Sequence, residues 1–349
     1  MGVDLILLSG FLGSGKTSLL VDFLQRDSAG ETGVIVNEVG EVGVDGAIVA
    51  DGSEGVPMTM LANGCVCCSL RSQLVDTVVA LLDAPRPPGR PPLKRIILET
   101  SGLSRPGPII ASLADPELSA RGLRLSVVST YDCESGSLNV ESFDEAAAQL
   151  AAAQRIVFTK TDRVPSDALE YHREVVAGVN PLAQIVSETD RGRAVARAFG
   201  AAPATEAIDL AERALLTMSG TGLKHPRIHV LTGTPKPELS WNELSLWLDD
   251  LAGFCGDRLL RFKALLHVAD CPEPILIQSV GTTFSAPRRM MGQVNARDGC
   301  VAITRDIDAE DINAVLDMPP IELSAAGRPS GDNALRWLTH STPYPDLRK

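Results

Sequence analysis

The sequence has 349 residues, of which 44% are hydrophobic and 22% are charged. This length and composition can bury a full core, argue against a disordered chain and favour two domains over one. The 44 acidic and 32 basic side chains give a formal net charge of -12, which repels phosphate backbones and anionic lipid headgroups. We therefore expect neither nucleic acid nor a membrane surface as a partner.

The N-terminal residues MGVDLILLSG run directly into a glycine-rich loop. They offer too few apolar residues for a signal peptide or a membrane span, so we expect a cytoplasmic protein. The chain has seven cysteines, an odd number that does not suit a disulfide scaffold. Four of them lie singly in apolar stretches, where a small buried thiol is the usual role: Cys133, Cys255, Cys271 and Cys300.

The first two hundred residues alternate short apolar runs with amphipathic runs. This pattern is typical of βαβ units around a mainly parallel sheet flanked by helices, an α/β domain. We predict strands at 5–8, 33–37, 96–98, 125–129, 156–158 and 184–186. Apolar residues three or four positions apart predict a helix over 69–83, with one buried face made by Leu70, Leu74, Val78 and Leu81.

From 200 to 222 the sequence becomes rich in Ala, Thr and Gly, as an interdomain connector is. The second unit is predicted to have strands near 228–231, 260–268, 275–280 and 300–304, and helices near 241–251 and 308–316. The turn-rich stretch 269–274 indicates an antiparallel hairpin, so we expect a smaller α+β domain. The predicted division is 1–204 for the first domain, 205–225 for the linker and 226–349 for the second domain. The tail after Pro319 is rich in Pro, Ser and Gly, and we expect its outermost residues to be poorly ordered.

The first predicted strand leads into Gly10-Phe11-Leu12-Gly13-Ser14-Gly15-Lys16-Thr17, and a predicted helix follows from Ser18. This is a complete P-loop in its strand-loop-helix context. Backbone N–H groups of such a loop surround phosphate oxygens, and the helix N-terminus adds partial positive charge. The predicted nucleotide-binding residues here are Gly10, Gly13, Ser14, Gly15, Lys16, Thr17 and Ser18.

Two side chains of this loop have predicted catalytic roles. Lys16 is expected to reach the β and γ phosphates, and the Thr17 hydroxyl to ligate Mg²⁺. Glu99 follows the strand at 96–98, at the edge of the sheet where a second Mg²⁺ carboxylate is needed. A solvated acid at a strand end is the alternative for Glu99.

The base of the nucleotide is expected near Thr159-Lys160-Thr161-Asp162, directly after another strand. The Asp162 carboxylate can accept both the N1–H and the amino protons of guanine, and adenine offers no such pair. The Lys160 stem would cover the base plane. This segment resembles the Asn-Lys-x-Asp signature of GTPases, with Thr159 in the Asn place. A solvated Lys/Asp pair is the alternative.

Three further cysteines, Cys65, Cys67 and Cys68, lie on one short loop before the helix at 69–83. Their soft thiolates favour Zn²⁺ or its neighbour Co²⁺, and a helix N-terminus lowers a thiol pKa. A disulfide between adjacent cysteines would be strained and reduced in the cytosol, while a redox relay remains open. Zinc usually takes four ligands, so the fourth position is open to water, a carboxylate or a partner, which suits metal transfer.

The combination of motifs resembles the CobW-like GTPases, relatives of the HypB and UreG metal-insertion GTPases, with the YjiA type as the nearest subgroup. The matching segments are the P-loop, 36–45, Gly64-Cys65-Val66-Cys67-Cys68, Glu99-Thr100-Ser101-Gly102 and Thr159-Lys160-Thr161-Asp162. The second domain adds Leu259-Leu260-Arg261-Phe262-Lys263 and Ile277-Gln278-Ser279-Val280. The resemblance thus covers nearly the whole chain.

The resemblance implies GTP binding with slow hydrolysis, Mg²⁺ as cofactor, and a transition metal, Zn²⁺ or Co²⁺, at the three cysteines. It places Glu38 and Glu41 in the segment that responds to nucleotide, where they are further candidate metal ligands. A solvated loop acid is the alternative for each. The family often has a histidine-rich stretch, whereas the five histidines here are dispersed, so metal storage is not expected.

The leading hypothesis is a GTP-driven metallochaperone or metalloenzyme activator that delivers metal to a client metalloprotein. One alternative is a P-loop kinase for a small molecule, with a zinc site that is only structural. Another is a metal-sensing interaction protein in which bound GTP merely locks a conformation. A homo-oligomer that depends on nucleotide or metal is also left open.

Overall fold

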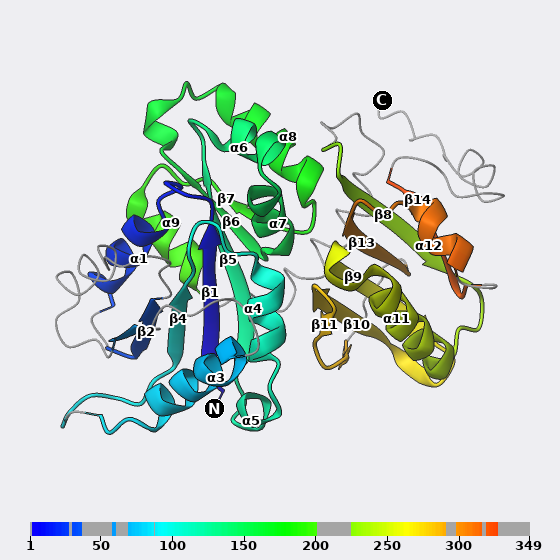
Figure 1. Cartoon of the computed structure of the whole chain (residues 1–349), viewed down its shortest axis with the longest axis horizontal. Helices are drawn as coiled ribbons and strands as arrows, with labels where there is room; N and C mark the ends of the chain where they lie inside the picture. Colours follow the sequence, from blue (N-terminus) through cyan, green and yellow to red (C-terminus); the bar gives the residue numbers. More distant parts are fainter. Residues whose placement is uncertain are drawn as a thin grey trace, which may run out of the picture.

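The computed structural model describes residues 2–27, 30–36, 58–60, 69–86, 88–200, 225–290, 298–315 and 319–326. These residues form two units, each built on a seven-stranded sheet, that lie side by side (Figure 1).

The sheet of the first unit is parallel, with strand order β3-β2-β4-β1-β5-β6-β7. The strands are β1 (Asp4–Gly10), β2 (Thr32–Val36), β3 (Met58–Met60), β4 (Arg95–Glu99), β5 (Arg124–Asp132), β6 (Arg155–Thr159) and β7 (Gln184–Val186). Central strands such as β1 read as continuous apolar runs because helices cover both faces of the sheet. Parallel pairing brings the carboxyl ends of β1, β4, β5 and β6 to one edge.

Helices on the two faces of this sheet build two separate cores. On one face, α1 (Lys16–Leu24) and α9 (Arg191–Phe199) pack through Leu20 and Phe199. The other face carries the larger core, to which α3 contributes Leu74, Val78 and Leu81. The helices of this second face are α3 (Ser69–Asp83), α4 (Pro106–Leu113), α5 (Pro116–Ala120), α6 (Gly136–Ser142), α7 (Asp144–Ala152) and α8 (Ala168–Val179).

The second unit has an antiparallel sheet with strand order β11-β10-β9-β13-β8-β14, and β12 pairs with β10. Its strands are β8 (Ile228–Pro235), β9 (Leu259–Val268), β10 (Cys271–Val280), β11 (Thr283–Phe284), β12 (Arg288–Arg289), β13 (Gly299–Arg305) and β14 (Ile321–Ala325). One face is covered by α11 (Trp241–Cys255) and α12 (Ala309–Val315), with the Trp247 ring against Phe262 of β9.

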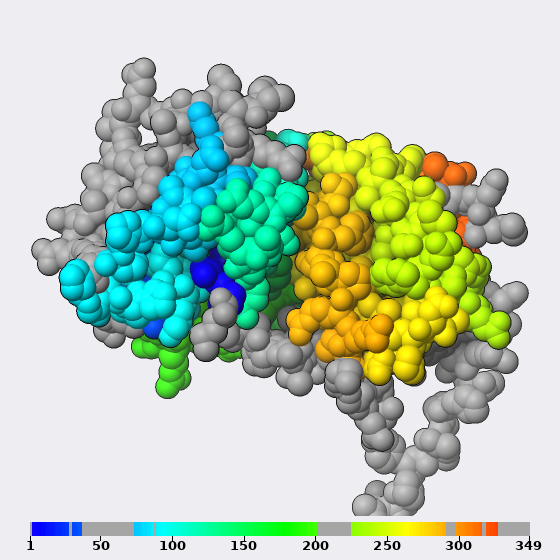
Figure 2. All heavy atoms as spheres, turned by 90° about the horizontal axis from the view of Figure 1, so that it is seen from below, coloured from blue at the N-terminus to red at the C-terminus, as the bar shows by residue number. Residues whose placement is uncertain are grey.

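The opposite face of this second sheet packs against the first unit. Ile228, Val301 and Ile303 join the core that contains α7 and α8. Gly107 of α4 lies close to Gly281, which follows β10. Figure 2 shows the same boundary from below, with β10 to β12 in orange beside the first unit. Within the described ranges, no helix combines the length and the apolar character needed to cross a bilayer.

The predicted fold class is confirmed, and each predicted strand and helix of both units has a counterpart. The hairpin is β9 and β10, which pair antiparallel across the turn after Val268. Helix α11 continues past the predicted end to Cys255. Four short strands were not predicted: β3, β11, β12 and β14, the last at the start of the tail whose outermost residues we expected to be poorly ordered. The predicted connector falls almost wholly outside the described residues, so the domain boundaries stay predictions.

Candidate nucleotide site

The backbone of the P-loop has positive φ angles at three glycines. Gly10, Gly13 and Gly15 have φ values of 141°, 70° and 89°, which L side chains rarely adopt. A Cβ on Gly10 would also lie 2.1 Å from Thr130 Oγ1 of β5. Glycine therefore suits the loop at all three places through its φ, and at Gly10 also because a side chain would clash with Thr130.

Side chains from two neighbouring strands fasten this loop. The Ser14 hydroxyl donates to the Phe11 carbonyl at 2.6 Å and lies 2.6 Å from Thr130 Oγ1. From the end of β6, the Thr159 hydroxyl donates to the Ser14 carbonyl at 2.8 Å. Thr159 thus supports the loop from the place that Asn holds in the GTPase signature.

Lys16 is buried inside the loop. Its ammonium donates to the carbonyls of Gly10 at 2.9 Å and Phe11 at 3.2 Å. These bonds hold a positive charge beside the backbone N–H groups that such loops turn toward phosphate.

Thr17, in the first turn of α1, lies beside Glu99 at the end of β4. The Thr17 hydroxyl donates to Glu99 Oε1 at 2.7 Å, and Glu99 is buried at the carboxyl end of β4. A hydroxyl and a carboxylate are hard oxygen donors of the kind that Mg²⁺ takes beside phosphate. The residues present therefore fit Mg²⁺, as the sequence predicts.

The segment after Glu99 lies against the P-loop. The Thr100 N–H donates to the Leu8 carbonyl at 3.0 Å, and a Cβ on Gly102 would lie 2.7 Å from the Leu12 nitrogen. Gln149 of α7 holds the other side, because its amide donates to the carbonyls of Gly102 at 3.0 Å and Ser104 at 2.9 Å. The sequence analysis missed Gln149. Its signal was a single amide within an alanine-rich helical run, DEAAAQLAAA.

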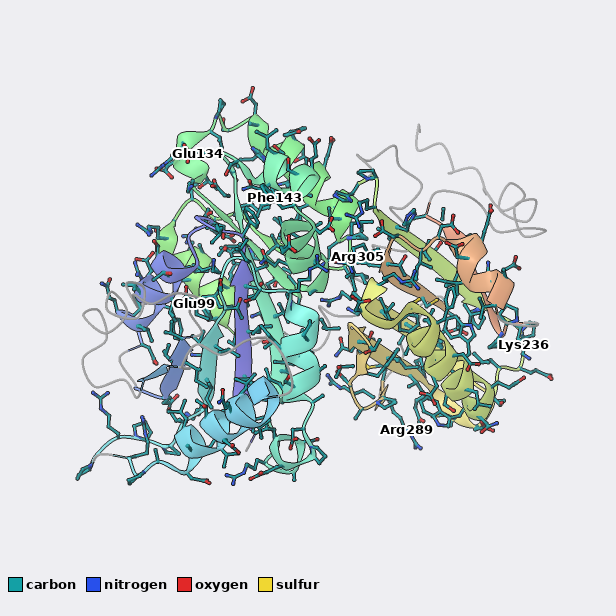
Figure 3. All side chains as sticks on the ribbon, in the orientation of Figure 1. Glu99, Glu134, Phe143, Lys236, Arg289 and Arg305 are labelled. Carbon is teal, nitrogen blue, oxygen red and sulfur yellow. The ribbon has the colours of Figure 1, made fainter. Side chains whose placement is uncertain are left out.

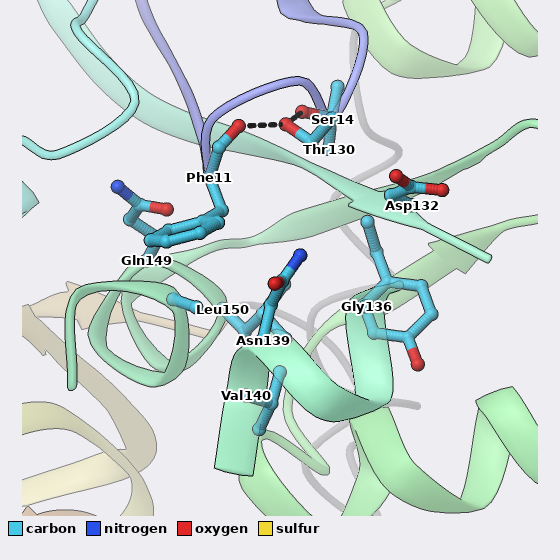
Figure 4. Close-up of a pocket in the computed structure, with 11 residues that line it drawn as sticks. Phe11, Ser14, Thr130, Asp132, Gly136, Asn139, Val140, Gln149 and Leu150 are labelled. Atoms are coloured by element: carbon cyan, nitrogen blue, oxygen red, sulfur yellow. Dashed lines mark hydrogen bonds between the residues drawn. The ribbon is translucent and has the colours of Figure 1, made fainter. Parts of the chain in front are cut away.

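A small pocket lies beneath the P-loop, between β5 and helices α6 and α7. Figure 4 shows Phe11, Gln149 and Asn139 around it, with Ser14 and Thr130 at its upper rim. The Phe11 ring also stacks on Phe143, with 4.8 Å between ring centroids. The apolar side of the P-loop therefore rests on the start of α7.

The base-reading segment follows β6. Lys160 has a φ of 54°, and its ammonium lies 2.6 Å from Asp132 Oδ2 at the end of β5. Burial alone would raise the pKa of Asp132, but hydrogen bonds from Lys160, the Glu134 N–H and Ser135 outweigh it and hold this pKa below its usual value. Asp162 lies two residues beyond Lys160 in a short 3₁₀ turn (Thr161–Arg163) and is exposed. Sequence analysis did not identify Asp132.

The predicted metal ligands Cys65, Cys67 and Cys68 lie outside the described residues, as do Glu38 and Glu41. The described part of the chain contains no group of three His, Cys, Asp or Glu side chains that could hold a metal ion. The other four cysteines are free and buried, as expected. Burial raises the pKa of Cys133 to about 12, of Cys255 to about 11 and of Cys300 to about 12.

Comparisons with known proteins cover most of the chain. The family model for the CobW/HypB/UreG nucleotide-binding domain matches residues 4–187, and the model for the C-terminal domain of the cobalamin synthesis protein CobW matches residues 228–318. The zinc chaperone YjiA of Escherichia coli is 31% identical over 324 residues, which cover 89% of this chain and 97% of YjiA. The zinc chaperone CobW of a Sinorhizobium species is 29% identical over 306 residues, or 78% of this chain and 84% of that protein.

The crystal structure of the Zn(II)-bound YjiA GTPase from Escherichia coli has the same fold. It matches with a TM-score of 0.61 and 22% sequence identity, over 90% of this chain and 98% of that chain. The two family models lie in the same order and in the two units described above. The chain therefore belongs to the CobW/HypB/UreG family of P-loop GTPases.

Proposed function

We propose that this protein binds GTP with Mg²⁺ at the P-loop and hydrolyses it slowly. The observation that carries this proposal is the Thr17–Glu99 pair beside the buried Lys16. Lys16 supplies positive charge to the β and γ phosphates, while Thr17 and Glu99 hold the cofactor. Bound Mg²⁺ neutralises charge on the phosphate oxygens.

Guanine selection is assigned to Asp162, with Lys160 against the base. Both follow β6, at the same edge of the sheet as the P-loop. The exposed Asp162 carboxylate offers two acceptor oxygens to the paired donors of guanine. Asp162→Asn should therefore relax the preference for GTP over ATP, and equal affinities of the unchanged protein for both nucleotides would contradict this assignment.

The cargo in this proposal is one Zn²⁺ or Co²⁺ ion, held by Cys65, Cys67 and Cys68 and delivered to a client metalloprotein. Two relatives named zinc chaperones support it. The chemistry of the remaining thiols supports it too, because thiolates bind metal and burial keeps Cys133, Cys255 and Cys300 protonated. A reducing cytoplasm would keep the three ligand thiols available.

Phosphate release from GTP, measured without any acceptor molecule, tests the enzymatic half of the proposal. The unchanged protein should release phosphate, and Lys16→Ala should abolish release because the loop loses its buried positive charge. A small-molecule kinase would instead consume ATP only with an acceptor. A metal-sensing protein that merely holds GTP would show negligible turnover even with metal and client present.

A further inference from the structure

Helix α7 contacts both the phosphate site and the second unit. Its first residues touch Arg105 of the first unit and Arg227 of the second, its middle touches the loop after Glu99, and its last residue touches β9. Figure 3 shows Phe143, which precedes this helix, in the first unit, and Arg305 at the boundary between the two units. No part of the proposed reaction uses these contacts.

On the phosphate side, α7 is hydrogen-bonded to the loop that joins Glu99 to α4. Gln149 is fully buried, and its side-chain amide donates to two carbonyls of this loop, at Gly102 and Ser104. Because the loop contacts the P-loop at Leu12, it lies between the nucleotide-binding loop and α7. Any shift of Glu99 would therefore be transmitted to Gln149.

Arg105, at the end of this loop, forms an ion pair with the start of α7. Its guanidinium donates to Glu145 Oε1 through Nε at 3.1 Å and Nη2 at 2.9 Å, and Nη2 lies 3.9 Å from Asp144. The charge pair fixes the end of the loop in the same place where Phe143 stacks on Phe11. The helix start is thus held by both the P-loop and the loop after Glu99.

On the other side, α7 is bound to the second unit at both of its ends. Arg227 Nη1 donates to both carboxylate oxygens of Asp144, at 2.6 and 2.7 Å, while its Nε and Nη2 bind Asp306. Arg261 of β9 donates to the Ala152 carbonyl at 3.0 Å. Arg261 is buried, and burial lowers its pKa to about 10, so it remains charged at neutral pH. A buried cation has a strong requirement for such a partner.

We propose that α7 couples the phosphate site to the second unit, with Gln149 as the positioning residue for the loop after Glu99 and Asp144–Arg227 as the contact with the second unit. The inference rests on the proposed binding of GTP. Glu99 lies beside Thr17, so exchange of GTP for GDP would alter the loop that Gln149 holds, and α7 would move against β8 and β9. Because such coupling is reciprocal, a change in the second unit must also change nucleotide affinity.

The first test alters the second unit alone. Arg227→Ala removes the pair with Asp144 and also the pair with Asp306 inside the second unit. Lys236→Ala is the control, because it removes a pair of the same length, 2.6 Å to Glu243, that stays within the second unit. Affinities for GDP and for a non-hydrolysable GTP analogue are measured by calorimetry with Mg²⁺. We expect Arg227→Ala to change the ratio of the two affinities by about fivefold or more, and Lys236→Ala to leave it unchanged. An unchanged ratio in Arg227→Ala would overturn the inference.

The second test alters the phosphate side and observes the second unit. Gln149→Met keeps the volume and removes the two donated hydrogen bonds. Amide hydrogen exchange in β8 and β9 should differ between the GDP and GTP-analogue states of the unchanged protein, and Gln149→Met should abolish this difference while still binding nucleotide. If the role of Gln149 is only structural, Gln149→Met will lower the stability of the protein but keep the difference in amide exchange between the two nucleotide states. If Gln149→Met does not fold, the first test still decides, because Arg227 is exposed and its substitution does not disturb a core.

The outcomes separate this inference from the function on which it rests. A protein that binds no guanine nucleotide would overturn the proposed function and the inference together. A protein that binds both nucleotides, yet shows identical exchange in β8 and β9, would overturn the inference alone.

Discussion

The Thr17–Glu99 pair is the most specific side-chain arrangement at the phosphate site, and it leads to a prediction about a single hydroxyl. Thr17→Ala should weaken Mg²⁺-dependent GTP binding by about tenfold or more, because one hydrogen bond to a buried carboxylate and one oxygen ligand are lost together. Thr17→Ser keeps the hydroxyl and should restore most of the affinity. Calorimetry with and without Mg²⁺ measures both variants. Equal Mg²⁺ dependence in the alanine and serine variants would remove Thr17 from the cofactor site.

Asp132 gives a pH prediction. Its folded-state pKa is held below the usual value, chiefly by the hydrogen bond from Lys160 acting against burial. Its contribution to stability is therefore present above the unfolded pKa of about 4 and is lost as pH falls through the lower folded pKa. Urea midpoints measured from pH 7 down to pH 3 should decline less steeply in Asp132→Asn than in the unchanged protein. If the urea midpoints of both proteins fall equally steeply with pH, the Asp132 carboxylate does not contribute to the pH dependence of stability.

Residues of the site differed in how far sequence could identify them. Lys16 and Thr17 were predictable because a P-loop is local, and Glu99 because parallel strands bring their carboxyl ends to one edge. Gln149 and its partner Gly102 are 47 positions apart, and nothing in an alanine-rich helix specifies which loop it will touch. Asp132 was missed for a related reason, since its partner Lys160 lies 28 positions away, directly after the following strand.

At the scale of elements, the P-loop predicts a contrast between two glycines. Gly10→Ala combines a disfavoured φ of 141° with a Cβ only 2.1 Å from Thr130, so it should cost about 1–3 kcal/mol and impair nucleotide binding. Gly253→Ala, within α11, meets no atom within 4 Å and should gain about 0.5–1 kcal/mol. Chemical denaturation of both variants tests this contrast. If Gly10→Ala leaves the free energy of unfolding unchanged, the loop can adopt another curvature.

The elements themselves were predicted best where periodicity was long. The apolar stripe of α3 and the continuous apolar run of β1 gave the right type and nearly the right ends. Strand β3 has three residues, too few for a periodic signal. Strand β14 follows Pro319 and Pro320 in a tail rich in Pro, Ser and Gly, and among the described strands it pairs with β8 alone. Its stability comes from that pairing, with Ile321 and Leu323 in the core, rather than from its own sequence.

For the whole molecule, two domains were predictable from the change of pattern, but the contact between them was not. The buried Arg261 reads in the sequence as a charge within an apolar strand. Only the fold shows that its guanidinium binds the last carbonyl of α7, 109 positions away. Long-range contacts of this kind decide whether two domains act separately or as one.

The chaperone hypothesis makes its sharpest prediction at this largest scale, where nucleotide and metal must share one equilibrium. The three cysteines directly precede α3, in the same domain as the P-loop, and the segment 36–45 is expected to sense the γ phosphate. If GTP tightens metal binding by some factor, metal must tighten GTP binding by the same factor. Zn²⁺ titrations with Mg²⁺ plus a non-hydrolysable GTP analogue, and again with GDP, should therefore give different affinities, tighter in the GTP state.

Cys67→Ser, which removes one ligand, should weaken Zn²⁺ binding in both nucleotide states and serves as the control for specific binding. Hydrolysis would then loosen the metal for a client. Indistinguishable Zn²⁺ affinities in the two nucleotide states would leave a static zinc site and defeat the delivery mechanism, even if the protein hydrolyses GTP.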